Sequence, residues 1–305
     1  MITVIIPTAS RPHMLRTALQ SVAAQTALGQ VSRIFVSENG GCRESGDICA
    51  EFPSLPITYV HRVPGTALDH ARHIMREYLE GELIAFLHDD DWWAPAHLAN
   101  AMQALEMHSG AAAYGACHYV VASESSMLNC SGNLFPWFAS TYAPFQPVWE
   151  LSRLNVLMGE LLGTLAHNSS LVMRREALRQ SAYVYELGNP FDNDRMLVFA
   201  LSFHGTLLFN PTPDTFVRNH PVQDCQSFAM EDRARHMCET TRWMVETSGK
   251  SWEAIAASFQ KRMKLCPDEA AATLLKLSLV DWCAPELSRQ LQSRSAANPS
   301  LAAAA

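Results

Sequence analysis

Three consecutive aspartates, Asp89, Asp90 and Asp91, follow a wholly apolar run at residues 83–87 and one histidine, His88. Carboxylates this close repel one another, and partial burial increases the repulsion. A divalent cation would relieve it, and oxygen ligands favour Mg²⁺ or Mn²⁺. Because Mg²⁺ completes its shell with substrate phosphates, the pattern predicts a metal-dependent site for a diphosphate. The alternative is an acidic turn that stabilises the N-terminus of the next helix.

The composition favours a globular protein and argues against several other classes. The chain has 305 residues, 48% of them hydrophobic and 17% charged, which is enough for a sizeable core and about two domains. Its net charge of −7 argues against a nucleic-acid partner. The absence of a signal-peptide pattern and of a long apolar run favours a cytoplasmic protein. The eight cysteines form no Cys-x-x-Cys pair, which argues against a zinc site or a disulfide framework.

The first hundred residues alternate between strand and helix patterns, and these elements must position the aspartates. Strands are predicted at 3–7, 34–36, 57–60 and 83–87, with helices beginning at Pro12, spanning 69–79 and beginning near Pro95. This alternation is typical of a mostly parallel sheet with right-handed crossovers. Ligands of such sheets bind beyond the carboxyl ends of the strands, which is where the aspartates lie.

The rest of the chain is less regular. Two more strands are predicted near 112–121 and 169–173, with long loops otherwise between residues 110 and 190. From about residue 228 the pattern is helical, with helices predicted at 252–265 and 268–280. We therefore expect a first domain at 1–227, a helical extension at 228–295 and a frayed tail at 296–305.

Several short motifs occur at characteristic positions around these elements. In chain order they are Pro7-Thr8 followed by Arg11, Glu38-Asn39-Gly40-Gly41 after the second strand, Ala71-Arg72-His73 on the helix before the aspartates, and His88-Asp89-Asp90-Asp91 with Pro95. Their order and spacing resemble those of the family 2 glycosyltransferases of GT-A fold, over residues 1–227. The resemblance implies an α/β fold with a Rossmann-like central sheet and flanking helices, here with a C-terminal helical extension.

The resemblance also implies roles for individual residues. Glu38 stands where the family has an aspartate that reads the base, and His88 replaces the first aspartate of the family's motif. The main metal ligand is then Asp90, with Asp91 in support, and His88 is either a further ligand or a plain hydrogen-bonding residue. The positions that match donor-binding residues are Thr8, Arg11, Glu38, Arg72, Asp89, Asp90 and Arg218, and those that match metal ligands are Asp90, Asp91 and His220.

A catalytic base is implied by the segment at residues 190–197, which resembles the family's Glu-Asp motif at the start of a helix that runs to a glycine, here Gly205. On this resemblance Asp194 is the base that deprotonates the acceptor hydroxyl, Asn193 replaces the usual glutamate, and Asp192 is the second candidate. The alternative is that Asp194 only caps the helix, although a helix N-terminus would also keep its carboxylate ionised.

Three further groups could contribute to the site. Residues 216–221 resemble the family's Arg-x-His loop that folds over the donor, in which Arg218 would pair with a phosphate and His220 would reach phosphate or metal; the alternative is a surface loop. Trp92 and Trp93 could stack on a sugar ring or fill the core. Residues 167–170 precede a strand and could face the donor sugar.

The resemblance thus implies a metal-dependent inverting glycosyltransferase that uses Mn²⁺ or Mg²⁺, with a nucleotide sugar as donor, UDP-sugar favoured, and a saccharide or lipid-linked saccharide as acceptor. Arg174-Arg175 and the basic residues at 261–264 are expected to be solvated, although they leave peripheral contact with the inner face of a membrane open. The C-terminal helices could also join a homo-oligomer. The rival interpretations are a nucleotidyltransferase on a related fold and a catalytically inactive nucleotide-sugar-binding scaffold.

Overall fold

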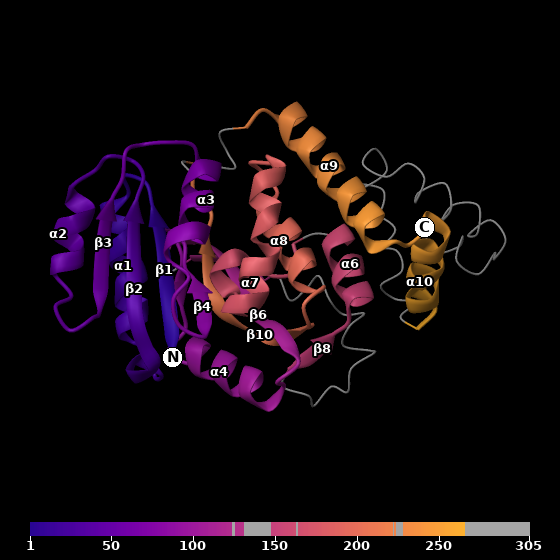
Figure 1. Ribbon diagram of the computed structural model, residues 1–305, viewed down its shortest axis with the longest axis horizontal. Helices are drawn as coiled ribbons and strands as arrows, with labels where there is room; N and C mark the ends of the chain where they lie inside the picture. Colours follow the sequence, from indigo (N-terminus) through magenta and orange to yellow (C-terminus); the bar gives the residue numbers. More distant parts are fainter. Residues whose placement is uncertain (124–125, 131–147, 163, 222, 224–227, 266–305) are drawn as a thin grey trace.

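The sheet in the described residues has the strand order β3-β2-β1-β4-β9-β6-β10-β5. Figure 1 shows it running from β3 at the left to β6 and β10 near the centre. The structure, a computed structural model, describes residues 1–123, 126–130, 148–162, 164–221, 223 and 228–265. The strands are β1 (Ile2–Thr8), β2 (Val31–Glu38), β3 (Ile57–His61), β4 (Leu83–Phe86), β5 (Trp92–Trp93), β6 (Ala111–Ser123), β9 (Val172–Arg174) and β10 (Thr206–Arg218), and β7 (Ser126–Cys130) and β8 (Trp149–Leu151) pair with β6 and β10.

The half of the sheet made by β1 to β4 is parallel, as the sequence predicts, and β1 pairs with both β2 and β4. Beyond β4 the directions are mixed. The short strand β9 is antiparallel to both β4 and β6, whereas β10 is parallel to β6. Two reversals restore the direction, so β6 and β10 point the same way as β4. The carboxyl ends of β1, β2, β4 and β10 therefore meet at one edge, together with the beginning of β9.

Four helices connect the parallel strands: α1 (Pro12–Ala23), α2 (Glu44–Ala50), α3 (Ala67–Glu77) and α4 (His97–Met107), with the 3₁₀ turn η1 (Leu28–Gln30) between α1 and β2. The prediction of long loops between residues 110 and 190 is wrong in part. That stretch contains α6 (Arg153–Leu162), η3 (Asn168–Ser170), α7 (Arg175–Ser181) and η4 (Ala182–Leu187). Ser169 and Ser170, predicted in a strand, belong to η3, because β9 begins only at Val172.

The later helices follow the predicted pattern. They are α8 (Asn193–Leu201), α9 (Met230–Ser248) and α10 (Trp252–Leu265), and the last of these has the predicted bounds. The helix predicted at 268–280 and the tail at 296–305 lie outside the described residues. Gly205, after α8, is required by close packing: a Cβ atom there would lie 2.4 Å from the carbonyl oxygen of Gly110.

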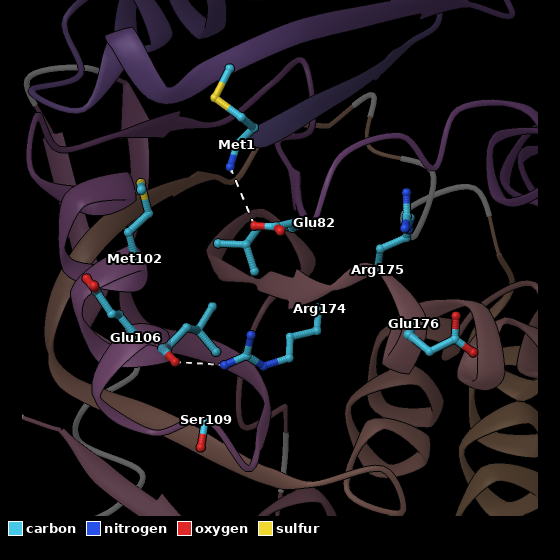
Figure 2. Close-up of a pocket in the computed structure, with 10 residues that line it drawn as sticks. Met1, Glu82, Met102, Glu106, Ser109, Arg174, Arg175 and Glu176 are labelled. Atoms are coloured by element: carbon cyan, nitrogen blue, oxygen red, sulfur yellow. Dashed lines mark hydrogen bonds and ion pairs between the residues drawn. The ribbon is translucent and has the colours of Figure 1, made fainter.

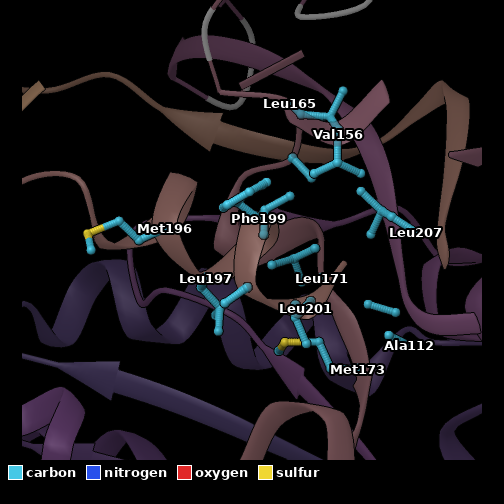
Figure 3. Close-up of a cluster of buried hydrophobic side chains, with 14 of the residues drawn as sticks. Ala112, Val156, Leu165, Leu171, Met173, Met196, Leu197, Phe199, Leu201 and Leu207 are labelled. Atoms are coloured by element: carbon cyan, nitrogen blue, oxygen red, sulfur yellow. The ribbon is translucent and has the colours of Figure 1, made fainter. Parts of the chain in front are cut away.

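Two apolar layers enclose the sheet. Successive strand residues point to opposite faces, so in β1 Val4 and Ile6 join the layer beneath α1 and α4, whereas Ile5 joins the layer beneath α3 and α8. Figure 3 shows part of the second layer, where Phe199 of α8 lies among apolar side chains that include Met173 of β9. The expectation that β4 is covered on both faces is confirmed, because all four of its residues are buried.

The helices α9 and α10 lie on the side of the protein away from α2 and β3 (Figure 1). Helix α9 contacts both α6 and α8. Met244 and Val245 of α9 and Phe259 of α10 belong to the same buried cluster as α8, and Trp243 meets Phe199 edge-to-face with ring centroids 5.7 Å apart. The helices after residue 228 thus share a core with the chain before it.

A hollow of about 660 Å³ opens at the amino ends of β1 and β4, opposite the edge that carries the aspartates (Figure 2). Its wall includes Met1, whose amino group lies 3.9 Å from Glu82, and Arg174. The guanidinium group of Arg174 donates to the carbonyl oxygens of Leu105 at 2.7 Å and Ala111 at 2.8 Å. The expectation that Arg174 is a solvated side chain is therefore wrong, since it caps the end of α4. Within the described residues, no helix combines the length and apolar character needed to cross a bilayer.

The buried His70 of α3 should make stability depend on pH. Its Nε2 lies 2.8 Å from Ser37 Oγ, and burial lowers its pKa from 6.5 to about 4. Between pH 6.5 and about 4 the imidazole of His70 is therefore protonated in the unfolded chain but neutral in the folded protein. Protonation of the unfolded chain favours unfolding, so stability that is present above pH 6.5 is lost as the pH falls toward 4. We expect the free energy of unfolding to lose on the order of 3 kcal/mol more in the wild type than in His70→Gln over this range, measured by urea unfolding. Equal losses in the two proteins would contradict this.

Candidate active site

Asp89, the first of the three aspartates, is fully buried and bound on both oxygens. Its Oδ2 accepts hydrogen bonds from Thr8 Oγ1 at 2.6 Å and Arg11 Nε at 3.1 Å, and its Oδ1 accepts one from Arg11 Nη2 at 2.6 Å. A two-point contact with a guanidinium group is a strong, geometrically specific pairing. The structure thus brings together Thr8, Arg11 and Asp89, which the sequence predicts as donor-binding residues.

Asp90 is contacted by side chains from both ends of the first 220 residues. Its Oδ2 accepts a hydrogen bond from Arg11 Nη1 at 3.2 Å and lies 3.0 Å from His220 Nε2. Arg218, at the end of β10, donates from Nε to the carbonyl oxygen of Asp90 at 3.0 Å. The alternative that residues 216–221 form an unconnected surface loop is therefore wrong, because they close over the aspartates.

Asp91 faces a different set of partners. Its Oδ2 accepts a hydrogen bond from Ser169 Oγ at 2.5 Å and its Oδ1 accepts one from the backbone N–H of Arg218 at 3.0 Å. The same Ser169 hydroxyl accepts a hydrogen bond from the backbone N–H of His88. His167 Nδ1 lies 3.5 Å from Asp91 Oδ2. The turn η3 therefore reaches the aspartates directly.

The three carboxyl groups differ in their tendency to ionise. Burial raises the pKa of Asp89 to about 6, although Arg11 acts in the opposite direction. Burial, helped by the charge of Asp90, raises the pKa of Asp91 to about 7. Burial also opposes ionisation of Asp90, but the hydrogen bond from His220 and the charge of Arg11 outweigh it and lower the pKa of Asp90 below its ordinary value. Asp90 is thus the carboxylate most strongly held in its charged form.

Part of the repulsion between the aspartates is relieved by the protein itself. The sequence argument assigns the neutralising charge to a divalent cation, whereas the structure places Arg11 on Asp89 and Asp90 and His220 on Asp90. Among the described residues, no arginine guanidinium group contacts the carboxylate of Asp91, whose charge is offset by hydrogen bonds and nearby imidazoles. A cation would therefore add to an existing balance of charge.

Glu38 lies at the end of β2, and its carboxylate is bound by the chain. Oε1 accepts hydrogen bonds from the backbone N–H groups of Ser10 at 3.0 Å and Gly40 at 2.6 Å, and Oε2 accepts one from Ser45 Oγ at 2.5 Å. The loops meet so closely that a Cβ atom at Gly40 would lie 2.6 Å from the nitrogen of Ser10, which itself has a φ of 58°. Glu38 therefore fixes the two loops at the nucleoside end of the predicted site.

Arg72 is not brought to the aspartates. Within the part of the chain that the structure describes, its polar partners are the carbonyl oxygen of Tyr185 at 3.1 Å and the carboxylates of Asp69 and Glu186 at 3.2 and 3.3 Å. These contacts connect α3 to η4, beside the start of α8. The guanidinium group is only partly exposed, so a donor phosphate would have to compete with two acidic groups for it.

Asp194 lies in the first turn of α8, as predicted. Its carboxylate contacts Asn168 and His167, the residues next to Ser169, which binds Asp91. Its Oδ1 accepts a hydrogen bond from Asn168 Nδ2 at 2.5 Å, and its Oδ2 lies 3.9 Å from His167 Nε2. About a third of its side chain, 31%, remains exposed. Asp194 is therefore fixed in position and still accessible, which are the two properties that a general base needs.

Asp192, the second candidate base, has a structural role instead. It is buried and pairs with Arg195 Nη1 at 2.8 Å, while Arg195 Nε lies 3.6 Å from Oε2 of the buried Glu160. Burial raises the pKa of Asp192, and it raises the pKa of Glu160 well above its ordinary value. The start of α8 is also held by Asn189, whose side chain donates a hydrogen bond to the carbonyl oxygen of His236 on α9 at 3.1 Å.

The two tryptophans take different positions. Trp93 is buried, stacks on His97 with ring centroids 4.8 Å apart and donates from Nε1 to the carbonyl oxygen of Ser169. Trp92 is half-buried and stacks on Phe216 at 5.3 Å, while the guanidinium carbon of Arg218 lies 4.9 Å from the centre of its ring. Trp93 is thus a core residue, and Trp92 supports the arginine at the site.

The roles of Asn168 and Ser169 are not predicted from the sequence. Residues 167–170 are expected to face a donor sugar, but the structure shows that Ser169 binds Asp91 and Asn168 binds Asp194. The missing information is the direction of β9, because only an antiparallel strand places the residues before it at the carboxyl edge of β4. The only feature of the sequence that points to these contacts is the polar run of residues 167–170 before a short apolar strand.

Comparisons with known proteins identify the family and the fold. The family model described as glycosyl transferase family 2 matches residues 3–180. A crystal structure of S. aureus TarS 1–349 in complex with UDP-GlcNAc superimposes with a TM-score of 0.65 and 14% identity, covering 95% of this chain and 83% of that chain. The mannosyltransferase PcManGT from Pyrobaculum calidifontis, in complex with GDP-Man and Mn²⁺, gives 0.50 and 14%, covering 97% and 86%. These likenesses confirm the predicted GT-A fold. No curated protein is similar enough in sequence to match.

The buried arginine in the first turn of α8, Arg195, should be critical for stability. Replacing Arg195 by Met leaves the buried Asp192 and Glu160 without their guanidinium partner, so we expect the free energy of unfolding to fall by about 3 kcal/mol or more. The matched control is Arg235→Met, because Arg235 also pairs with two carboxylates but is 56% exposed. We expect the control to lose less than about 1 kcal/mol. Similar losses in urea unfolding of the two variants would contradict the assignment.

Proposed function

The chain belongs to glycosyl transferase family 2, and we propose that it transfers a sugar from a nucleoside-diphosphate donor to a hydroxyl group of a saccharide or lipid-linked saccharide. The observation that carries the proposal is the turn η3, in which Asn168 holds Asp194 and Ser169 holds Asp91. Adjacent residues of one short turn thus hold the candidate base and the acidic cluster. Such an arrangement suits a displacement in which an acceptor is deprotonated on one side while a diphosphate leaves on the other.

The donor diphosphate would bind among Arg11, Arg218 and the aspartates. Arg218 is placed for this by its contact with the carbonyl oxygen of Asp90 and by the ring of Trp92 beneath its guanidinium group. Both arginines also carry charge that would stabilise the leaving diphosphate. Thr8 and Asp89 would contribute through the position in which they hold Arg11.

A divalent cation fits the residues at Asp90. Asp90 Oδ2 and His220 Nε2 lie 3.0 Å apart, and the two are a carboxylate and an imidazole, both suitable for Mn²⁺. Asp90 and His220 would hold the cation, whereas Asp91, the third predicted ligand, faces Ser169 and His167. When bound, a cation would neutralise the diphosphate and make it a better leaving group.

Asp194 would accept the proton of the acceptor hydroxyl as the oxygen attacks the anomeric carbon. The C–O bond to the diphosphate breaks while the new C–O bond forms, so a single displacement inverts the anomeric configuration. Asn168 keeps one carboxylate oxygen of Asp194 occupied, which leaves the other for the proton.

We favour a UDP-sugar as donor, with support from the TarS complex that contains UDP-GlcNAc. The bound carboxylate of Glu38 fixes the loops at the nucleoside end, so their shape would select the base. The division into residues 1–227 and a helical extension at 228–295 remains part of the proposal, with the extension available for the acceptor, a membrane surface or a second subunit.

Two other functions fit less well. A nucleotidyltransferase would need a glycine-rich loop with a basic residue after the first strand, and the residues that follow β1, Ala9-Ser10-Arg11, contain no glycine. A catalytically inactive binding scaffold would have no need of a base held in position while exposed, as Asp194 is.

Nucleotide binding can be tested without knowledge of the acceptor. We expect one nucleoside diphosphate, UDP in our proposal, to raise the melting temperature in the presence of Mn²⁺ and to raise it less without the cation. At a ligand concentration about 100 times Kd the stabilisation is about 2.7 kcal/mol, because only the folded protein binds. A panel of UDP, GDP, ADP and CDP with and without Mn²⁺ provides the measurement. A flat response to every nucleotide would overturn the proposal.

The base assignment is tested by Asp194→Asn. We expect donor turnover, by transfer or by slow hydrolysis, to fall about 100-fold or more, because the amide cannot accept the proton. The matched control is Asp232→Asn, since Asp232 also lies in the first turn of a helix, α9, but on the exposed surface. Unchanged turnover in Asp194→Asn, with unchanged nucleotide binding, would rule out this base.

A further inference from the structure

The geometry assigns a second cation site to His88, Asp91 and His167, separate from the pair formed by Asp90 and His220, with a preference for transition metals such as Zn²⁺, Co²⁺ or Mn²⁺ over Mg²⁺. Each of the three residues offers one ligand atom, and these atoms lie within 4.8 Å of one another. This inference goes beyond the proposed sugar transfer and does not depend on it, because it concerns the binding of a metal alone.

The three side chains lie close together. His167 Nδ1 lies 3.5 Å from Asp91 Oδ2. The rings of His88 and His167 have centroids 5.3 Å apart and are nearly perpendicular, at 77°. Ligand atoms around a cation with bonds of about 2.0–2.2 Å are spaced about 3–3.5 Å apart. The existing spacing between His167 and Asp91 meets this requirement, and the ligand atom of His88 lies within 4.8 Å of both.

The surroundings hold the ligands as those of a metal site would. Asp91 receives hydrogen bonds from Ser169 Oγ and from the backbone N–H of Arg218. His167 Nδ1 accepts a hydrogen bond from the backbone N–H of Ser169 at 3.3 Å, which holds the ring in place and which a cation at Nδ1 would replace. Nε2 then faces Asp194 at 3.9 Å. An imidazole ligand whose other nitrogen faces a carboxylate is a recurring support of protein metal sites.

The site is separate from the one that the family resemblance implies. Asp90 Oδ2 is shared by Arg11 and His220, whereas Asp91 is bound through Ser169 and faces His167. Among the described residues, no hydrogen bond or ion pair joins His220 to Asp91 or His167 to Asp90. The two carboxylates therefore point into two different groups of partners, and each group contains at least one histidine.

The ligand types set the preference for the metal. Two imidazoles and one carboxylate suit Zn²⁺, Co²⁺, Fe²⁺ and Mn²⁺, whereas Mg²⁺ and Ca²⁺ prefer a shell made of oxygen alone. Three protein ligands also leave coordination positions free for water or for an oxygen of a bound substrate. Because His167 lies between Asp91 and Asp194, such an oxygen would be on the side of the candidate base.

The experiment is a calorimetric titration of the purified full chain, without nucleotide, with ZnCl₂ and with MgCl₂. We expect a Zn²⁺ site whose Kd rises about tenfold or more in His167→Ala and in His88→Gln, and a Mg²⁺ affinity at least about 100-fold weaker. The control is His108→Ala, a partly exposed histidine remote from the site, which should bind Zn²⁺ as the wild type does. In His220→Ala, which removes a ligand of the other group, this Zn²⁺ site should remain.

Each result decides the question. Loss of Zn²⁺ binding in His220→Ala with binding kept in His167→Ala would overturn the assignment, and so would absence of a stoichiometric site in the wild type. A melting curve for each variant checks the fold, and the paired substitutions at His88 and His167 keep the test valid if one variant unfolds. A flat response to nucleotides with Zn²⁺ binding intact would overturn the proposed transfer and leave this site standing.

Discussion

The structure depends on burying three adjacent carboxyl groups at the end of β4. Each of them is stabilised by a partner from a different part of the chain: Arg11 before α1 for Asp89, His220 after β10 for Asp90, and Ser169 in η3 for Asp91. A buried carboxylate without such a partner would cost several kcal/mol. The charge at one strand end therefore requires the first loop, the middle turn and the last strand of the sheet to meet there.

The antiparallel strand β9 makes this meeting possible. Inserted between β4 and β6, it brings η3 to the edge of the sheet where β4 ends, while β6 and β10 keep the direction of the parallel half. One short turn can then contact Asp91 through Ser169 and Asp194 through Asn168. The geometry of the site follows from this reversal more than from any single side chain.

The sequence predicts the parallel half well, because β1 to β4 are short apolar runs separated by clear helical patterns. It also predicts that Thr8, Arg11, Asp89, Asp90, Arg218 and His220 come together. It misses β10, since Pro211 and Pro213 interrupt the strand at the irregularity between Asn210 and Thr215. It misses the occupied carboxylate of Glu38 and the engagement of Arg72 with η4, because both depend on contacts between loops and helices that no local pattern encodes.

The contacts of helix α9 determine where the chain can be shortened. Asn189, just before α8, is bound to the backbone of His236 and to Thr240, and Met244 and Val245 complete the apolar layer that contains Phe199. A fragment that stopped at residue 227 would expose that layer to water and release the anchor of the helix that carries Asp194. The shortest piece of the chain able to fold and be purified in soluble form therefore extends through α9, beyond the point where the sheet itself is complete.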